Sequence, residues 1–249
     1  MICSMKMTAN DNDEFINESE LGTKQFWDRF YDEELINFND LGDSGETWFG
    51  TRNTRKIIDW VNENHVKNDA ICDIGCGNGY VLAQLAQRNF TNLYGLDYSE
   101  KAIEFCQKQY NQFNIHFNVV DILNDNFQND QKFDAIIDKG TYDAICLMPD
   151  ADIHENRKRY LKFLINNLKN NGHFIIVTCN FTKEEIFKFL SISNNVHNNI
   201  NNDNNNILKT DYHFIHEFDT PTLSFGGHVG KLITGLIFCK KNTIKINPN

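Results

Sequence analysis

A glycine-rich segment between an apolar run and an amphipathic stretch constrains this chain more than any other feature of its sequence. The segment reads Asp73-Ile74-Gly75-Cys76-Gly77-Asn78-Gly79. The apolar run over 70–74 predicts a buried strand before it, and apolar residues at helical spacing over 81–86 predict a helix after it. Glycines at alternate positions allow a tight turn and let a ligand approach the free N–H groups at the helix start. The pattern therefore predicts a strand–turn–helix unit that binds a nucleotide-like ligand.

The alternation of strands and helices continues along most of the chain. Helices are predicted around 26–31 and over 54–64, and strands over 93–97, 115–120, 133–137 and 174–179. Ser99 is a predicted helix N-cap, Thr182 and Glu185 form a predicted capping box, and a helix containing 161–168 is expected to stop near Gly172. Such βαβ units give a parallel sheet with helices on both faces.

Two late apolar runs, over about 212–219 and 231–239, have no predicted helix between them. A loop around Pro221, Gly226, Gly227 and Gly230 joins them. Strands that lack a crossover helix can pair antiparallel, so we expect these two to form an antiparallel pair at one edge of the sheet.

The segments outside this alternation are polar. Residues 1–18 are acidic and lack the apolar core of a targeting peptide, so we expect a flexible N-terminus. Residues 194–206 are rich in asparagine and cannot bury enough apolar area to offset their ordering entropy, which predicts a disordered insertion. Residues 242–249 are expected to form a C-terminal tail. The expected organisation is thus a single domain over 19–241.

Composition argues against several functional classes. The chain has 34 acidic and 24 basic residues, a formal net charge of −10, and such a surface repels the phosphates of nucleic acids. No apolar run approaches the roughly 18 residues that a membrane-spanning helix needs. The seven cysteines form no CxxC pair and the histidines no HExxH, so we expect reduced cysteines in a cytosolic protein and no metal site.

Three carboxylates follow the predicted carboxyl ends of strands, where open α/β sheets bind ligands. Asp73 ends the first strand directly before the first glycine, which favours a ligand with an amino group over a pyrophosphate. Asp97 could accept hydrogen bonds from both ribose hydroxyls, and Asp121 could meet an adenine amino group. Tyr80 replaces the third glycine of the dinucleotide fingerprint, so the loop favours an amino-acid-bearing nucleoside over NAD.

The order of these motifs resembles that of the class I methyltransferases that use S-adenosylmethionine. The resemblance covers roughly residues 50–240. It implies S-adenosylmethionine as cofactor and a Rossmann-like, doubly wound, seven-stranded, mostly parallel sheet with an antiparallel last strand. The aromatic residues before the sheet would form a lid over the cofactor, with plain core packing as the alternative. The implied cofactor-binding residues are Asp73, Gly75, Gly77, Gly79, Asp97, Tyr98, Asp121, Ile122, Trp27, Trp48 and Phe49.

Five further segments resemble the protein-lysine methyltransferases that modify translation elongation factor 1-alpha. They occupy 19–28, 43–50, 138–145, 179–182 and 225–227, in the order of that family. The resemblance implies a cytoplasmic, monomeric protein-lysine N-methyltransferase whose methyltransferase domain spans 19–241 and whose acidic surface faces a basic protein substrate. Another protein or a small metabolite is the alternative acceptor. A nucleic-acid acceptor is disfavoured because no proline follows the fourth strand, and a scaffold without turnover because the glycine motif and Asp97 are intact.

The segments after the fourth and fifth predicted strands hold the candidate residues for the reaction. Asp138 ends that strand beside the expected position of the sulfonium methyl and is the predicted catalytic residue. Asp143 would help it guide a lysine ammonium. Tyr142 and Phe181 would line a channel and hold the cation over their rings, and Asn180 completes the predicted substrate-binding set.

The acceptor lysine must also lose its proton before transfer. With an ordinary pKa of about 10.4, deprotonation near pH 7 costs roughly 4–5 kcal/mol, which desolvation can reduce. Holding the reacting atoms in line at roughly 3 Å can contribute about 7–11 kcal/mol. Lys139 would repel an ammonium group, so we expect it to point away from the substrate or to pair with an acid.

Overall fold

The structure is a computed structural model that describes residues 18–125, 131–149, 151–192, 206–225 and 228–246. The predicted flexible N-terminus (1–18) and asparagine-rich insertion (194–206) lie outside these residues, except for Glu18 and Asn206. Within the described part of the chain, no helix is both long enough and apolar enough to cross a membrane.

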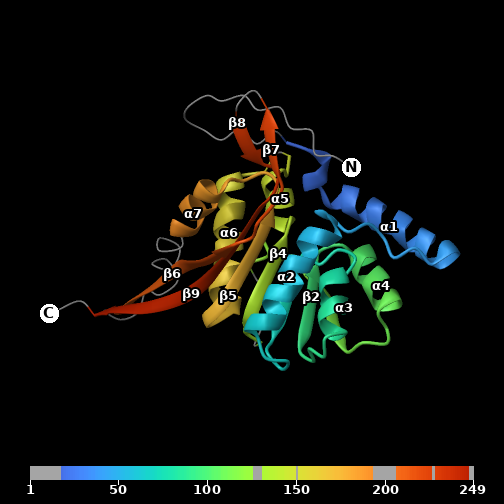
Figure 1. The fold of residues 1–249 in the computed structure, drawn as a ribbon, viewed down its shortest axis with the longest axis horizontal. Helices are drawn as coiled ribbons and strands as arrows, with labels where there is room; N and C mark the ends of the chain where they lie inside the picture. The colour runs from blue at the N-terminus through green and yellow to red at the C-terminus, as the bar shows by residue number, and fades with distance from the viewer. Residues whose placement is uncertain (1–17, 126–130, 150, 193–205, 226–227, 247–249) are drawn as a thin grey trace.

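Seven strands form one sheet in the order β3-β2-β1-β4-β5-β9-β6 (Figure 1). The first five run parallel, and β9 pairs antiparallel with both β5 and β6. This confirms the predicted Rossmann-like, doubly wound sheet with an antiparallel last strand. The strands are β1 (Ile71–Ile74), β2 (Leu93–Asp97), β3 (Ile115–Val119), β4 (Phe133–Lys139), β5 (Leu168–Thr178), β6 (Asn206–Glu217) and β9 (Thr234–Ile246).

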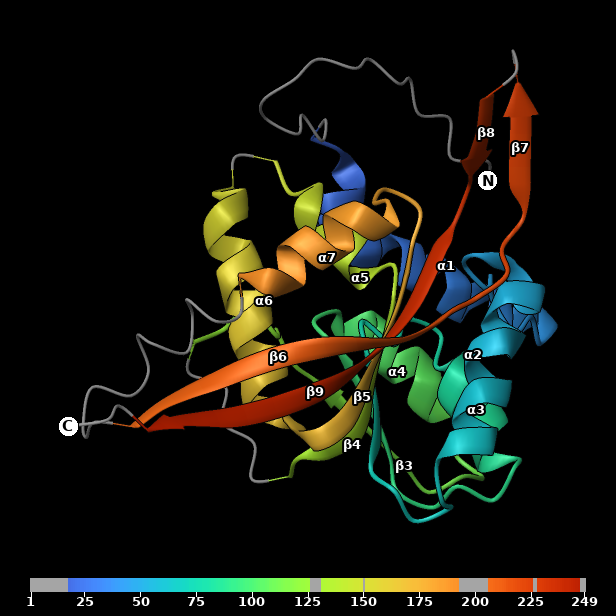
Figure 2. The same cartoon turned by 60° about the vertical axis from the view of Figure 1, so that its left-hand side comes forward.

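Helices cover both faces of the sheet (Figures 1 and 2). Successive side chains of the central strands point alternately into two cores. Because both faces of the sheet are covered, the sequences of these strands are nearly continuous apolar runs. One core packs against α5, α6 and α7, and the other against α2, α3 and α4. The helices are α1 (Lys24–Leu41), α2 (Gly50–Asn64), α3 (Tyr80–Ala86), α4 (Glu100–Gln109), α5 (Thr141–Cys146), α6 (Ile153–Asn167) and α7 (Lys183–Ser191), with a 3₁₀ turn, η1 (Glu20–Gly22).

The local sequence signals for helix starts are confirmed. The Ser99 hydroxyl accepts a hydrogen bond from the backbone N–H of Ala102 at the start of α4. Thr182 and Glu185 form the full capping box of α7, each side chain accepting from the other residue's backbone N–H. These side chains satisfy N–H groups that the first turn of a helix leaves without partners.

Three boundaries differ from the prediction. The helix expected to stop near Gly172 ends at Asn167, because Leu168 already pairs with Phe133 of β4 as the first residue of β5. The loop expected between the last two strands contains a hairpin, β7 (Thr222–Phe225) and β8 (His228–Lys231). Strand β9 extends to Ile246, into the expected C-terminal tail, because its pairing with β6 continues that far.

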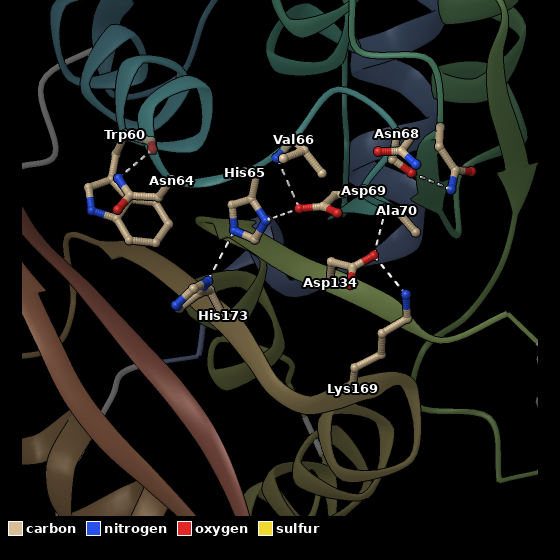
Figure 3. Close-up of polar contacts among 11 residues, drawn as sticks. Trp60, Asn64, His65, Val66, Asn68, Asp69, Ala70, Asp134, Lys169 and His173 are labelled. Carbon is tan, nitrogen blue, oxygen red and sulfur yellow. Dashed lines mark hydrogen bonds and ion pairs between the residues drawn. The ribbon is translucent and has the colours of Figure 1, made fainter.

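Polar side chains tie the sheet together at the amino ends of its central strands (Figure 3). The Asp134 carboxylate on β4 accepts hydrogen bonds from the backbone N–H of Ala70, just before β1, and from Lys169 Nζ on β5, both at 2.8 Å. One side chain thus links three adjacent strands. These ties support the register of the backbone ladders, and that register determines which residues meet at the opposite, carboxyl edge.

Candidate active site

The glycine motif forms the turn between β1 and α3, at the carboxyl edge of the sheet. Gly75, Gly77 and Gly79 have φ values of 60°, 55° and 68°, in the left-handed region that favours glycine. A Cβ atom at Gly75 would collide with Thr141 Oγ1 of α5, and one at Gly77 with the Tyr31 hydroxyl of α1. The turn therefore needs glycine both for its backbone angles and for the close approach of its neighbours.

Asp73 lies in β1, directly before the glycine turn, and is buried. Its side chain is 1% exposed, and neither carboxylate oxygen has a partner among the described residues. Burial raises the pKa of Asp73 to about 7, although the charge of Lys139 opposes the rise. A buried carboxylate without donors is costly, and an ammonium group of a ligand would supply both charge and donors. These residues fit a cofactor that carries an amino group.

The second and third predicted carboxylates follow β2 and β3, which neighbour β1 at the same edge. Asp97 accepts hydrogen bonds from the backbone N–H groups of Gly77 at 3.0 Å and Ser99 at 2.9 Å. Burial raises the pKa of Asp97 to about 6, and these hydrogen bonds oppose the rise.

Asp121, which follows β3, is exposed and accepts a hydrogen bond from the backbone N–H of Leu123. The sheet thus brings Asp73, Asp97 and Asp121 to one edge, as the sequence predicted. Two further residues of the predicted cofactor-binding set lie next to these carboxylates in the sequence. Tyr98, after Asp97, is half-buried, and Ile122, after Asp121, is buried.

The aromatic residues of the predicted lid lie on and around α1, where Trp27 stacks on Tyr31, whose hydroxyl reaches the glycine turn at Gly77. The rings of Trp27 on α1 and Trp48 are 5.1 Å apart, and the Trp48 indole N–H is buried without a partner in the described part of the chain. Phe49, which precedes α2, packs against Gly140. Helix α1 also packs along α4, and Figure 1 shows it beside α4. The placement fits a lid, and contact of these rings with a cofactor stays a prediction.

Asp138 ends β4 at the predicted edge, but its carboxylate is turned into the core. It is fully buried and accepts hydrogen bonds from the backbone N–H of Thr141 at 2.9 Å, that of Tyr142 at 3.0 Å and the Tyr160 hydroxyl at 2.5 Å. Burial raises the pKa of Asp138 to about 7, with the Tyr160 bond opposing the rise. The carboxylate therefore fixes the start of α5, and direct contact with a substrate stays a prediction.

Asp143 fixes the turn after β5 in the same way, by accepting hydrogen bonds from it. Its carboxylate accepts hydrogen bonds from the Thr178 hydroxyl at 2.5 Å and from the backbone N–H groups of Cys179 and Asn180, each at 3.1 Å. Asp143 is itself buried, whereas Asn180 is partly exposed. Through these bonds α5 and the turn before α7 are held together as one unit.

The predicted channel residues Tyr142 and Phe181 lie together but are buried in the core beside α6 and α7. Tyr142 is 1% exposed, and its ring lies 4.5 Å from that of Phe189 and 4.8 Å from that of Phe181. The Arg157 guanidinium of α6 lies over both rings, at 5.9 and 5.6 Å from their centroids. These rings therefore do not line an open channel in this structure, because α5 directs them toward α6 and α7 and the cation above them comes from the chain itself.

Three residues that contact the site from neighbouring helices were not predicted from the sequence. Tyr160 and Arg157 lie on α6, and Tyr31 reaches the glycine turn from α1. In the sequence, Tyr160 appears as one more apolar position of a helix. No local signal shows that its hydroxyl meets Asp138, because the two residues are brought together only when α6 packs on the sheet.

Comparisons with known proteins agree with this geometry. Residues 65–223 match the family described as "Methyltransferase domain". EEF1A lysine methyltransferase 2 of Danio rerio is 38% identical over 224 residues, covering 88% of each chain. The protein-lysine N-methyltransferase EFM4 of Saccharomyces cerevisiae is 32% identical over 245 residues, covering 91% of this chain and 97% of its own.

The fold is also found among solved structures. The N-methyltransferase NodS from Bradyrhizobium japonicum, in complex with S-adenosyl-L-homocysteine, aligns with a TM-score of 0.56. The alignment covers 86% of this chain and 97% of NodS at 14% identity, so the likeness is one of fold.

Proposed function

This chain belongs to the methyltransferase family that includes EEF1A lysine methyltransferase 2, and from that premise we propose that it methylates a lysine of translation elongation factor 1-alpha. It is an S-adenosylmethionine-dependent protein-lysine N-methyltransferase. The observation that carries the substrate proposal is the identity of 38% over 88% of both chains, which extends well beyond the cofactor-binding motif.

The residues at the carboxyl edge have defined parts in this proposal. The cofactor supplies a methyl group on a positively charged sulfur. Asp73 binds the cofactor's ammonium group, Asp97 its ribose hydroxyls and Asp121 its adenine amino group. Backbone N–H groups of the glycine turn face the same ligand. An ionised carboxylate has about four acceptor sites, so Asp97 can bind hydroxyl groups while it still accepts from Gly77 and Ser99.

The chain's contribution to methyl transfer is mainly positioning. Asp138 fixes α5 and Asp143 fixes the turn before α7, so the segments around the acceptor are held rigidly. In this proposal both act as positioning residues, and the partly exposed Asn180 is the residue that contacts the substrate. Rigid placement supports in-line transfer, and desolvation of the acceptor lysine lowers the cost of removing its proton.

We place the reaction in the cytoplasm, with the enzyme acting as a monomer on a protein partner. The net charge of −10 favours a basic partner surface, because complementary charge speeds association. The dependence on charge implies that turnover slows as salt concentration rises.

A labelled-methyl assay tests the substrate. The protein is incubated with labelled S-adenosylmethionine and purified elongation factor 1-alpha, with a mixture of small metabolites as competing acceptors and Asp73→Asn as the control enzyme. Label should appear on lysine of the elongation factor and be strongly reduced with the control. Label found only on a metabolite or on another protein would contradict the substrate proposal and leave the enzyme class intact.

A further inference from the structure

Lys139 lies on the same side of the sheet as Asp73. Asp73 of β1 pairs with Ile137 of β4, and partners in a parallel ladder point to the same face. Lys139 follows Ile137 by two positions within the same strand, so its side chain returns to that face. Carrying the register one step beyond the Ile74–Asp138 pair places Lys139 beside Gly75, at the start of the glycine turn.

The charged groups of Asp73 and Lys139 are near enough to influence each other's pKa. Burial lowers the pKa of Lys139, and the carboxylate of Asp73 opposes that change. Within the described residues, neither side chain takes part in a hydrogen bond or in an ion pair within 4.0 Å. Lys139 is partly exposed, so its ammonium group can reach a ligand at the edge.

Asp97, the other buried carboxylate nearby, is already held by two backbone N–H groups. Among the residues that the structure describes, Asp73 and Lys139 are thus two neighbouring opposite charges for which no hydrogen bond or ion pair is found. The amino-acid end of S-adenosylmethionine is a zwitterion, with an ammonium group and a carboxylate on one carbon. An unpaired carboxylate beside an unpaired ammonium group is complementary to it.

We propose that Lys139 binds the carboxylate of the cofactor's amino-acid end while Asp73 binds its ammonium group, so that the two side chains together recognise the zwitterion. The inference rests on the family's cofactor and not on the identity of the methyl acceptor. It gives Lys139 a role that agrees with its position, since its charge faces away from Asp138 and Tyr142, which point into the opposite core.

Two other roles for Lys139 predict different behaviour. As a base for the acceptor lysine, it would affect turnover and leave cofactor binding unchanged. As a simple counter-charge for Asp73, it would affect every ligand that carries the ammonium group by the same factor, whether or not a carboxylate is present.

Calorimetry with two ligands separates these roles. The ligands are S-adenosylhomocysteine and its decarboxylated analogue, which keeps the ammonium group and lacks the carboxylate. Lys139→Met keeps an unbranched side chain that is one atom shorter and removes its charge. Lys169→Met, which removes a lysine beside Asp134 at the opposite edge of the sheet, is the matched control.

Loss of a charge-assisted hydrogen bond should weaken binding of S-adenosylhomocysteine to Lys139→Met by about tenfold to a hundredfold. Binding of the decarboxylated analogue should change by less than about threefold, because this ligand has no carboxylate with which Lys139 could form the hydrogen bond. Asp73→Asn should weaken both ligands, and the control neither. Lys139→Arg keeps the charge and should therefore retain a preference for the ligand with the carboxylate. If circular dichroism shows that Lys139→Met is unfolded, Lys139→Arg is the variant used for the comparison.

Equal loss for both ligands, or no loss for either, would overturn the inference. Because neither ligand needs a methyl acceptor, the outcome is independent of whether elongation factor 1-alpha is the substrate.

Discussion

At the scale of single residues, the predicted cofactor site holds a carboxylate that is unfavourable for the fold. Asp73 is buried, lacks partners in the described chain, and has a pKa raised by burial to about 7, well above the ordinary value. The folded state thus binds this proton more tightly than the unfolded state. Its contribution to stability is complete below about pH 4 and is lost as the pH rises through about 7.

Asp73→Asn should therefore stabilise the cofactor-free protein, increasingly so as the pH is raised from 5 to 8. At 1.36 kcal/mol per pKa unit, the gain at pH 8 is roughly 1–4 kcal/mol. Thermal unfolding of both proteins at several pH values measures it, and calorimetry should show weaker binding of S-adenosylhomocysteine. A variant that is less stable than the parent at pH 8 would contradict this view of Asp73.

The sequence predicted these residues unequally well, for a physical reason. The positions of Asp73 and the three glycines follow from a strand end and a tight turn, which are local properties of the chain. Asp138 was located correctly at the edge, but its orientation depends on Tyr160, 22 positions away on another helix. A side chain's direction at a strand end is decided by what packs there, and the local pattern does not contain that information.

At the scale of elements, α5 depends on the hydrogen bond between Tyr160 and Asp138. Tyr160→Phe removes one donor that favours the ionised carboxylate, so it should cost about 1 kcal/mol of stability and raise the pKa of Asp138 further. If ionised Asp138 is needed to hold α5, the acidic limb of the activity–pH profile should move to higher pH.

Tyr212→Phe is the matched control for that variant. The Tyr212 hydroxyl is buried without a partner among the described residues, so its removal breaks no hydrogen bond. Thermal unfolding and pH–rate profiles of both variants make the comparison. Identical behaviour of the two variants would show that the contact between Tyr160 and Asp138 has no part in stability or in positioning.

The amino-terminal edge contains a second pH-sensitive element (Figure 3). His65 lies between Asp69, at 2.9 Å, and His173 of β5, at 3.1 Å. Burial lowers the pKa of His173, and the neighbouring His65 lowers it further. The unfolded chain then binds this proton more readily, so stability should fall as the pH drops below about 6.5 toward the lowered value.

His173→Gln should reduce this loss of stability between pH 7 and pH 5. His154→Gln, at an exposed position of α6, is the control and should follow the parent protein. Thermal unfolding across this range measures the effect. An unchanged pH dependence in His173→Gln would show that the histidine pair does not govern the acid response.

Elements were predictable where their signals are local. The N-caps of α4 and α7 and the apolar runs of the parallel strands are of this kind. The end of α6 and the hairpin β7–β8 were not predicted. For α6, Gly172 was interpreted as the helix stop, whereas Leu168 already pairs with Phe133 in the sheet. Pairing across the sheet overrode the local signal there.

At the scale of the whole molecule, the order of the motifs along the chain determines a single arrangement. Consecutive βαβ units with right-handed crossovers place β1, β2 and β3 side by side, and the carboxylates that follow them meet at one edge. The sheet and the meeting of the three carboxylates at one edge could therefore be predicted from the sequence. The buried packing of α5 against α6 and α7 could not, since it depends on contacts between segments far apart in the chain.

The most direct test of the account is mass spectrometry of elongation factor 1-alpha from cells that have or lack this protein. We expect one lysine that carries methyl groups in the first cells and is unmodified in the second. It should regain the methyl groups when the parent protein is restored, but not when Asp73→Asn is supplied instead. Methylation of the elongation factor that is the same in all four samples would contradict this expectation.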